Sequence, residues 1–483
     1  MQTGVIISLA AYFILMLGIG VYAWRKTAAD TEGYLLAGRD LSPKVTALSA
    51  GASDMSGWLL LGLPGALYAS GLVEAWIAIG LFLGAFVNWI VVAPRLRRQT
   101  EALGDALTIP EYLGNRFPSH AALLRLTCAV IVVVFFTVYT AAGMVGGGKL
   151  FETAFNGSYM TGIWITAGVV LVYTMIGGFL AVSLTDFVQG CIMFGALVLM
   201  PLVLLFGSDI SLTAVPQEGF LSLGHGLTAI GWLSAVTWGL GYFGQPHIIV
   251  RFMAIRSADE MPVARNIAMA WMGVCLLGAI GVGLAGRAYV EANGIALKDP
   301  ETIFILLANL LFHPLVTGFL YAALLAAIMS TISSQLLVSS SSLTEDFYRL
   351  FLRKEAGERE AVTVGRVSVL LVALMGIVIA RDPDSEVLGL VAHAWAGFGA
   401  AFGPMIVLAL TWKRMTGAGA AAGLVVGAAV VIAWIVLGWD KAFLGGPGVY
   451  EILPGFILSW LAIVVVSRIG APEVPEDAAP GVH

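Results

Sequence analysis

The sequence has few charged residues. Only 11% of its 483 residues are Asp, Glu, Lys or Arg, and 59% are hydrophobic. A soluble globular protein carries about 25% charged residues. The shortage of polar side chains therefore excludes a soluble particle of this size, and we expect a lipid bilayer to cover much of its surface.

Features of several other protein classes are missing. The net charge is -5 with no basic stripe, which argues against nucleic-acid binding. The three cysteines, Cys128, Cys191 and Cys275, all lie in apolar runs, so we expect buried thiols rather than disulfides or a metal site. No nucleophile–base pair, metal motif or phosphate loop falls at membrane depth, so the sequence predicts neither an enzyme nor an organic cofactor.

Long polar segments are missing too. The longest lie near 94–120, 207–226 and 342–360, and each is far shorter than a folded domain. We therefore expect a single transmembrane domain over 1–470, with no obligate protein partner implied. A disordered cytoplasmic tail is expected at 471–483.

Apolar runs fill the rest of the chain. A helix needs about 20 apolar residues to cross about 30 Å of hydrocarbon. The sequence thus predicts an all-α, polytopic membrane protein with about 13 transmembrane helices. They lie at roughly 4–23, 44–70, 72–93, 124–148, 158–179, 186–206, 227–252, 267–289, 306–341, 361–380, 387–411, 416–437 and 452–467.

The basic residues orient these helices. With residue 1 outside and the spans alternating, the outside segments hold only Lys149, Arg287, Lys298, Arg381 and Lys441, so 20 of the 25 basic residues lie inside. This bias agrees with the positive-inside rule. We expect a multi-pass protein of the plasma (inner) membrane with the N-terminus outside and the C-terminus cytoplasmic. The first run is expected to be a retained helix, because no basic residue precedes it as in a signal peptide.

Two predicted spans are interrupted. Residues 49–58 read SAGASDMSGW, and residues 238–247 read WGLGYFGQPH. Glycine and proline weaken a helix, although both are common in membrane helices in general. The two segments lie five spans apart and therefore have opposite orientations. They predict a five-plus-five inverted repeat, with copies at about 44–206 and 227–411.

A broken membrane helix can form a binding site. Its freed carbonyl groups suit a desolvated cation, and its freed amides suit a carboxylate. In the ninth span Ala327, Ser330 and Thr331 share one helix face, where two hydroxyls can complete the shell of a sodium ion. The alternative is that each hydroxyl bonds the carbonyl four residues earlier in its own helix.

Aromatic residues near the breaks suggest a pocket. Trp238 and Tyr242 flank the second break at positions i and i+4, and Tyr139 lies in the fourth span. Aromatic walls suit a small apolar ring and an ammonium group. Ordinary core packing is the alternative for each ring.

Charged residues within membrane spans are functional by default. Asp54 lies in the first break, where it can be an ion ligand, a remote electrostatic aid or a helix cap. Asp186 begins the sixth predicted span, and a helix N-cap is the favoured interpretation over a place on an ion path. Arg251 is expected to snorkel from the inner end of the seventh span.

Five longer motifs resemble one known family. SAGASDMSGWLLLGLPGA, GGFLAVSLTDFVQ, WGLGYFGQPHI, AAIMSTISSQLLVSSSSLTED and AWAGFGAAFGP are similar to the bacterial sodium/solute symporter family, and the first and third point to its proline branch. The resemblance covers about residues 5–470. It implies a leucine-transporter-type inverted-repeat core and sodium-coupled symport of L-proline into the cell by alternating access. Another small amino or organic acid is the alternative substrate.

The resemblance also implies a sodium site. It assigns the ion to the backbone oxygens of Ala52, Met55 and Ala327 and to the hydroxyls of Ser330 and Thr331. This set includes the two hydroxyls that helix periodicity also places together.

The remaining family residues concern the substrate and its coupling to sodium. The resemblance implies a proline site formed by Ser56, Gly57, Tyr139, Trp238, Tyr242 and Pro246. Asp54 matches a carboxylate that matters for sodium coupling, and Arg39 a cytoplasmic residue that influences coupling. A channel is the rival outside this family, but it would need a continuous polar pore, and the sequence offers isolated polar groups.

Overall fold

The computed structural model describes residues 2–26 and 36–470, so the predicted tail at 471–483 lies outside the described residues. Nearly all of the described chain is helical, with short 3-10 or π segments labelled η. In chain order the elements are α1 (Thr3–Lys26), η1 (Ala37–Arg39), α3 (Pro43–Asp54), η2 (Trp58–Gly62), α4 (Leu63–Ser70), η3 (Leu72–Glu74), α5 (Ala75–Val91), α6 (Ala93–Ala102), α7 (Ile109–Arg116), η4 (Pro118–His120), α8 (Ala121–Phe155), α9 (Tyr159–Gly207), η5 (Leu212–Ala214), α10 (Ala229–Val236), η6 (Thr237–Gly244), α11 (Pro246–Ala254), η7 (Ala258–Glu260), α12 (Met261–Ala292), η8 (Pro300–Thr302), α13 (Ile303–Leu311), α14 (Pro314–Ser341), η9 (Ser342–Leu352), α15 (Glu358–Ile379), α16 (Val387–Thr411), α17 (Gly417–Val436), β1 (Ala442–Phe443), β2 (Gly446–Pro447) and α18 (Ile452–Ile469).

Each of the thirteen predicted spans coincides with helix. Among the described residues, ten helices are long and apolar enough to cross a membrane. The other three spans are the interrupted series α3–η2–α4 and α10–η6–α11 and the first part of α9. Both sequence-predicted breaks are therefore present.

A glycine separates the fifth and sixth spans. The backbone of Gly178 has φ 59° and ψ −161°, which divides α9 into two helical segments. A side chain would be strained at this positive φ, so glycine is the residue that permits the turn. The sixth helix thus begins at Gly178, and not at Asp186 as predicted.

Other expectations need correction. The ninth predicted span, 306–341, is two helices, because Phe312 is extended and Pro314 starts α14. The predicted loop near 94–120 contains α6 and α7. Cys128 and Cys275 are buried as expected, but Cys191 is exposed.

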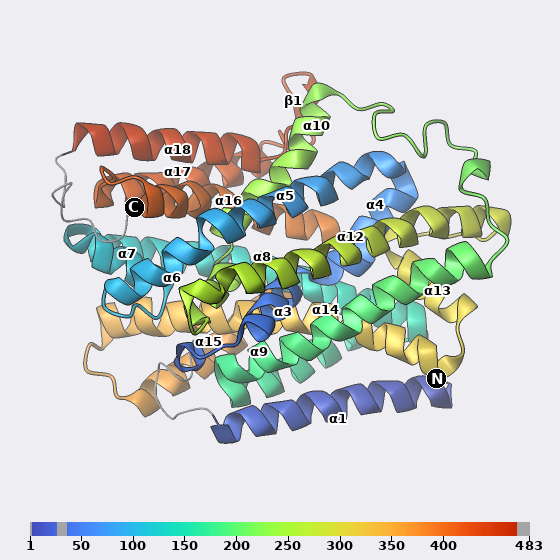
Figure 1. Ribbon diagram of the computed structural model, residues 1–483, viewed down its shortest axis with the longest axis horizontal. Helices are drawn as coiled ribbons and strands as arrows, with labels where there is room; N and C mark the ends of the chain where they lie inside the picture. Colours follow the sequence, from blue (N-terminus) through green and yellow to red (C-terminus); the bar gives the residue numbers. More distant parts are fainter. Residues whose placement is uncertain (1, 27–35, 471–483) are drawn as a thin grey trace.

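Among the membrane-length helices that the structure describes, α14 and α16 lie deepest inside the bundle. Figure 1 shows α1 along one edge of the molecule and α17 and α18 along the opposite edge. The most apolar windows of α14 and α16 are 78% and 89% buried, against 28% for α1 and α18. The start of α1 and the end of α18 lie at opposite ends of the molecule (Figure 1), as an odd number of spans requires.

Glycines let the second break approach its neighbour closely. A Cβ atom added to Gly84 of α5 would lie 2.1 Å from the carbonyl oxygen of Gly239 in η6. The two backbones therefore touch directly, in the way that small residues allow between membrane helices. This contact holds η6 beside the third predicted span.

Candidate ion and substrate site

The first break lies at the end of α3. The last residue of α3 is Asp54, after which Met55 leaves the helix with φ −78° and ψ 72°. The Asp54 carbonyl, freed from the helical pattern, accepts hydrogen bonds from the Ser56 amide at 2.9 Å, the Trp58 indole at 3.2 Å and the Tyr139 hydroxyl at 3.4 Å. The break is thus held open by specific donors.

The second break lies between η6 and α11. Its tight 3-10 segment, η6, ends at Gly244. The backbone of the next residue, Gln245, is extended, and Pro246 then begins α11. The side chain of Gln245 donates to the Trp395 carbonyl at 3.1 Å. Proline fits the first turn of a helix because no intrahelical partner is needed there. The sequence therefore unwinds this span just before Pro246.

Four of the five predicted sodium ligands are brought together. The Ser330 hydroxyl lies 2.7 Å from the Ala52 carbonyl oxygen and 3.2 Å from that of Ala327. The Thr331 hydroxyl lies 3.2 Å from the same Ala327 oxygen. All four residues are buried. The hydroxyls make the backbone bonds of the alternative interpretation, but Ser330 also reaches across to the first break.

Met55, the fifth predicted ligand, lies at the break itself. It is fully buried and follows Ala52 by three residues, and its amide donates to the Gly51 carbonyl at 2.8 Å. Gly57 faces the ninth span, since a Cβ added there would lie 3.3 Å from Ile328 of α14. The first break and α14 therefore share one interface around these residues.

Asp54 connects the two breaks. Its carboxylate accepts a hydrogen bond from the Tyr242 hydroxyl of η6. Tyr139 of α8, which bonds the Asp54 carbonyl, is 1% exposed, and Tyr242 is 3% exposed. Two predicted substrate residues thus meet at one acidic residue, and no contact of this kind could be read from their separate positions in the sequence.

A tryptophan that sequence reasoning missed completes the aromatic wall. The Trp395 indole of α16 donates to the Trp238 carbonyl at 2.7 Å and meets the Tyr242 ring edge-on, with centroids 5.0 Å apart. A Cβ on Gly241 would lie 1.9 Å from the Trp395 ring nitrogen. The only sequence signal was its place in the motif AWAGFGAAFGP.

Trp238 also separates the site from a vestibule. Its ring stacks on that of Tyr450, with centroids 5.0 Å apart. Both rings line a cavity of about 740 Å³, with Glu74, His393 and Glu451 among its polar residues. Burial, and then the neighbouring Glu451, raise the pKa of the Tyr450 phenol, which donates to the Ala392 carbonyl at 2.8 Å.

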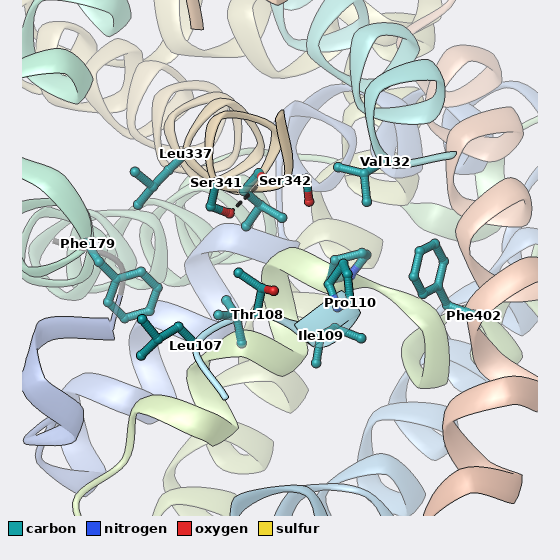
Figure 2. Close-up of a pocket in the computed structure, with 13 residues that line it drawn as sticks. Leu107, Thr108, Ile109, Pro110, Val132, Phe179, Leu337, Ser341, Ser342 and Phe402 are labelled. Atoms are coloured by element: carbon teal, nitrogen blue, oxygen red, sulfur yellow. Dashed lines mark hydrogen bonds between the residues drawn. The ribbon is translucent and has the colours of Figure 1, made fainter. Parts of the chain in front are cut away.

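The space on the other side of the second break is much smaller. A cavity of about 30 Å³ is enclosed by Leu107, Thr108, Phe179 and Ser341, among others, and Pro246 also lines it. Figure 2 shows Leu107 and Thr108 of the segment before α7 near Phe179 of α9 and Ser341 of α14. The cavity beyond Trp238 is therefore much larger than the one that Pro246 lines.

Arg251 and Asp186 correct two predictions. Arg251 is 1% exposed and pairs with the fully buried Asp186 at 3.0 Å, so it does not snorkel. Asp186 lies inside the second segment of α9, so it is not a helix N-cap. The same guanidinium donates to Ser49 at 3.1 Å and to Ser334 at 2.6 Å. A buried guanidinium needs a counter-charge, and Asp186 provides it for Arg251.

Arg39 lies apart from this cluster. It is 8% exposed and donates to the carbonyls of Ala106 at 2.6 Å and Met253 at 3.2 Å. It thereby ties the segment before α3 to the loop before α7 and to the end of α11. Any influence on the ion site must therefore act through these elements.

These observations define a class of protein. Membrane-length helices surround two interrupted helices, which meet at a buried cluster of carbonyl, hydroxyl and aromatic groups. This is the architecture of secondary transporters that bind their substrates at helix breaks.

The chain belongs to the sodium:solute symporter family, whose family model matches residues 34–427. It is 53% identical over 468 residues to the high-affinity proline transporter PutP of Bacillus subtilis, covering 96% of this chain and 97% of that protein. It is 52% identical to the osmoregulated proline transporter OpuE of the same organism, covering 97% and 95%. It is 51% identical to a sodium/proline symporter of Staphylococcus aureus, covering 96% and 92%.

Solved structures share the fold. A Na+-coupled sialic acid symporter in a substrate-bound outward-open state aligns with a TM-score of 0.82 at 17% identity, covering 98% of this chain and 99% of that one. Mhp1, a nucleobase-cation-symport-1 family transporter, aligns with a TM-score of 0.56 at 15% identity, covering 92% and 97%. The leucine-transporter-type fold expected from the sequence is confirmed.

Proposed function

We propose that this protein is a sodium-coupled symporter that carries L-proline into the cell by alternating access. The observation that carries this proposal is the meeting of both breaks around Asp54, beside oxygens suited to sodium. Relatives named for proline transport, 51–53% identical over nearly the whole chain, support the substrate. Membership of the sodium:solute symporter family supports sodium as the coupling ion.

The sodium ion binds between the first break and α14. Its ligands are the carbonyl oxygens of Ala52, Met55 and Ala327 and the hydroxyl oxygens of Ser330 and Thr331. The short Ser330–Ala52 and Ser330–Ala327 distances support this set. These ligands are neutral oxygens, which suit a hard monovalent cation. Because the surroundings are buried, the attraction between the oxygen dipoles and the ion is stronger than in water.

Proline binds on the aromatic side of the breaks. Tyr139, Trp238 and Tyr242 enclose the ring and its secondary ammonium group. Ser56 and Gly57 lie beside the first break, where the start of the following half-helix receives the carboxylate. Pro246 shapes the second break and fixes where it ends.

Sodium and proline are coupled through Asp54. Sodium binding orders the Ala52–Met55 stretch, which fixes Asp54 and, through its hydrogen bond, the Tyr242 hydroxyl of the substrate site. This assigns Asp54 an indirect role. A ligand that binds better to the ordered state shifts the population toward it.

The two barriers open alternately. While the Trp238–Tyr450 stack is open toward the vestibule the inner path is closed, and when the stack closes, the small cavity near Pro246 widens and the inner path opens. Arg39 acts at this inner end, where it binds the loop before α7. The vestibule faces outside in the plasma (inner) membrane, with the N-terminus outside and the C-terminus cytoplasmic. Residues 44–206 and 227–411 are the two repeats, and no organic cofactor is required.

The energy of one sodium ion is adequate. One charge crossing 100 mV releases about 2.3 kcal/mol, and a tenfold sodium gradient adds about 1.4 kcal/mol. Together, about 3.7 kcal/mol supports accumulation of a few hundredfold.

Equilibrium binding to the purified protein tests the substrate and ion together. Labelled L-proline is titrated in sodium chloride and in choline chloride, with unlabelled amino and organic acids as competitors. We expect saturable binding in sodium, displaced best by L-proline. Displacement by another acid at lower concentration would replace proline as the substrate, and equal binding in choline would remove sodium as its coupling ion.

A further inference from the structure

A third, still smaller cavity lies beside Asp54. It has a volume of about 20 Å³ and is lined by three polar residues, Asp54, Asn88 and Tyr242. The rest of its lining is small or apolar, mostly alanine, methionine and tryptophan. Asn88 belongs to α5, so the cavity joins the third predicted span to both breaks.

Two buried oxygens of residues that line this cavity have no hydrogen-bond partner among the described residues. They are the second carboxylate oxygen of Asp54, Oδ1, and the amide oxygen of Asn88, Oδ1. The two residues are only 3% and 1% exposed. An unsatisfied buried acceptor costs about 1–3 kcal/mol, and more when it is charged. Such atoms call for a ligand.

The size and chemistry of the cavity select that ligand. A cavity of about 10–15 Å³ or more can hold one water if it has two to four polar partners. The volume is too small for a second proline. Sodium would need more oxygen ligands than this lining offers. One water, by contrast, can donate a hydrogen bond to each of the two unpaired oxygens.

We propose that a single buried water bridges Asn88 and Asp54, and that Asn88 is a positioning residue for the substrate site. The water fixes one oxygen of the Asp54 carboxylate, while the other oxygen accepts the bond from Tyr242. Asn88 thereby holds the Tyr242 hydroxyl in place without touching the substrate. This inference rests on the proposed function, because it assigns Tyr242 to the proline site.

Two substitutions separate water bridging from packing. Asn88→Leu keeps the branched shape and the number of side-chain heavy atoms but removes the acceptor, and its two methyl groups leave no room for another polar group. Asn88→Ala leaves space for a second water that can replace the amide. Bridging therefore predicts that Asn88→Leu harms proline transport more than Asn88→Ala, whereas a packing role predicts the reverse order.

The measurement is the KM of sodium-driven proline uptake by reconstituted full-length protein. We expect Asn88→Leu to raise the KM for proline about tenfold, the change given by about 1.4 kcal/mol, and Asn88→Ala to raise it less. Asn266→Leu, at the start of α12 and outside the cavity, is the matched control and should leave the KM unchanged. A larger effect of Asn88→Ala, or no effect of either variant, would overturn the inference.

A double substitution gives an independent readout. If Asn88 acts through Asp54 on Tyr242, then Asn88→Ala should have no further effect on KM in a Tyr242→Phe background. Additive effects would show that Asn88 acts elsewhere. This pair also keeps the test decisive if Asn88→Leu does not fold. A wild-type protein that does not transport proline would instead refute the proposed function.

Discussion

At the scale of single residues, the candidate ion site depends on two hydroxyls of one helix. Ser330 contacts both Ala52 and Ala327, while Thr331 contacts Ala327 alone. Ser330 therefore joins two elements, and we expect it to matter most. Ser330→Ala should raise the sodium concentration for half-maximal uptake about 10- to 100-fold, because a hydrogen-bonding partner of a charged group is worth about 1.5–3 kcal/mol.

Thr331→Ser provides the control for this prediction, since it keeps the hydroxyl and removes only a methyl group. It should leave the sodium dependence close to that of the wild type. Sodium titrations of proline uptake check both variants. Unchanged sodium dependence in Ser330→Ala would show that the ion binds elsewhere.

Tyr242 should affect the substrate more than the ion. Tyr242→Phe keeps the ring against Trp395 but removes the hydroxyl that donates to Asp54. A buried carboxylate without its donor costs about 1–3 kcal/mol, so we expect the KM for proline to rise about tenfold and the sodium dependence to change less. Competition binding measures the first effect and sodium titration the second. A larger change in the sodium dependence would contradict this order.

Single residues differ in how far the sequence predicts them. Ala327, Ser330 and Thr331 share a helix face, so their grouping follows from helix periodicity. Their contact with Ala52, 278 positions away from Ser330 in the chain, follows only from the packing of the helices. Trp395 could not be assigned from its own position, since one aromatic residue in a membrane helix usually packs in the core.

At the scale of elements, the second break depends on one glycine. The Trp395 indole occupies the space where a side chain at position 241 would lie, with a Cβ only 1.9 Å from the ring nitrogen. Gly241→Ala should therefore displace Trp395 or η6 and abolish most transport. Gly168→Ala, in α9 where a Cβ meets no atom of the described residues within 4 Å, should leave transport intact. Uptake assays on equal amounts of folded protein compare the two, and near-normal transport by Gly241→Ala would contradict the packing described.

The breaks themselves were predictable because their causes are local. Glycine and proline weaken a helix wherever they occur, so 49–58 and 238–247 can be recognised from the sequence. The break before Pro314 was missed, although His313 and Pro314 mark it, because the residues on both sides are apolar. The start of the sixth helix at Gly178 was also missed, because no polar residue interrupts the sequence at this kink.

At the scale of the whole molecule, the buried Arg251–Asp186 pair joins α11 to α9 and, through Ser49 and Ser334, to α3 and α14. Asp186→Asn would leave a buried guanidinium without its counter-charge, which costs about 3–5 kcal/mol. We expect a clearly lower thermal unfolding temperature. Glu260→Gln, which breaks the exposed pair with Arg256, should cost less than about 1 kcal/mol.

Thermal unfolding of the purified variants in one detergent measures this difference. Equal melting temperatures for Asp186→Asn and Glu260→Gln would show that the buried pair does not hold these elements together. The pair was not predictable from the sequence, because an arginine near the end of a membrane helix more often reaches water. Its partner lies 65 positions away and is brought near by the fold.

The architecture as a whole was well predicted. The apolar runs predicted the positions of the helices, and the separation of the two breaks by five spans predicted the inverted repeat. The very different sizes of the two cavities were not predictable, because they depend on how the helices pack in three dimensions. The Trp238–Tyr450 stack that limits the vestibule joins residues that lie 212 positions apart in the chain.

The central claim is that a sodium gradient drives proline across the membrane through this site. Purified protein in liposomes, given labelled L-proline and an inward sodium gradient, tests it most directly against an equal choline gradient. Ser330→Ala liposomes serve as the matched control. The account predicts transient accumulation above equilibrium with sodium alone, and its loss in the variant at low sodium. Equal uptake in sodium and choline, or none in either from folded protein, would contradict it.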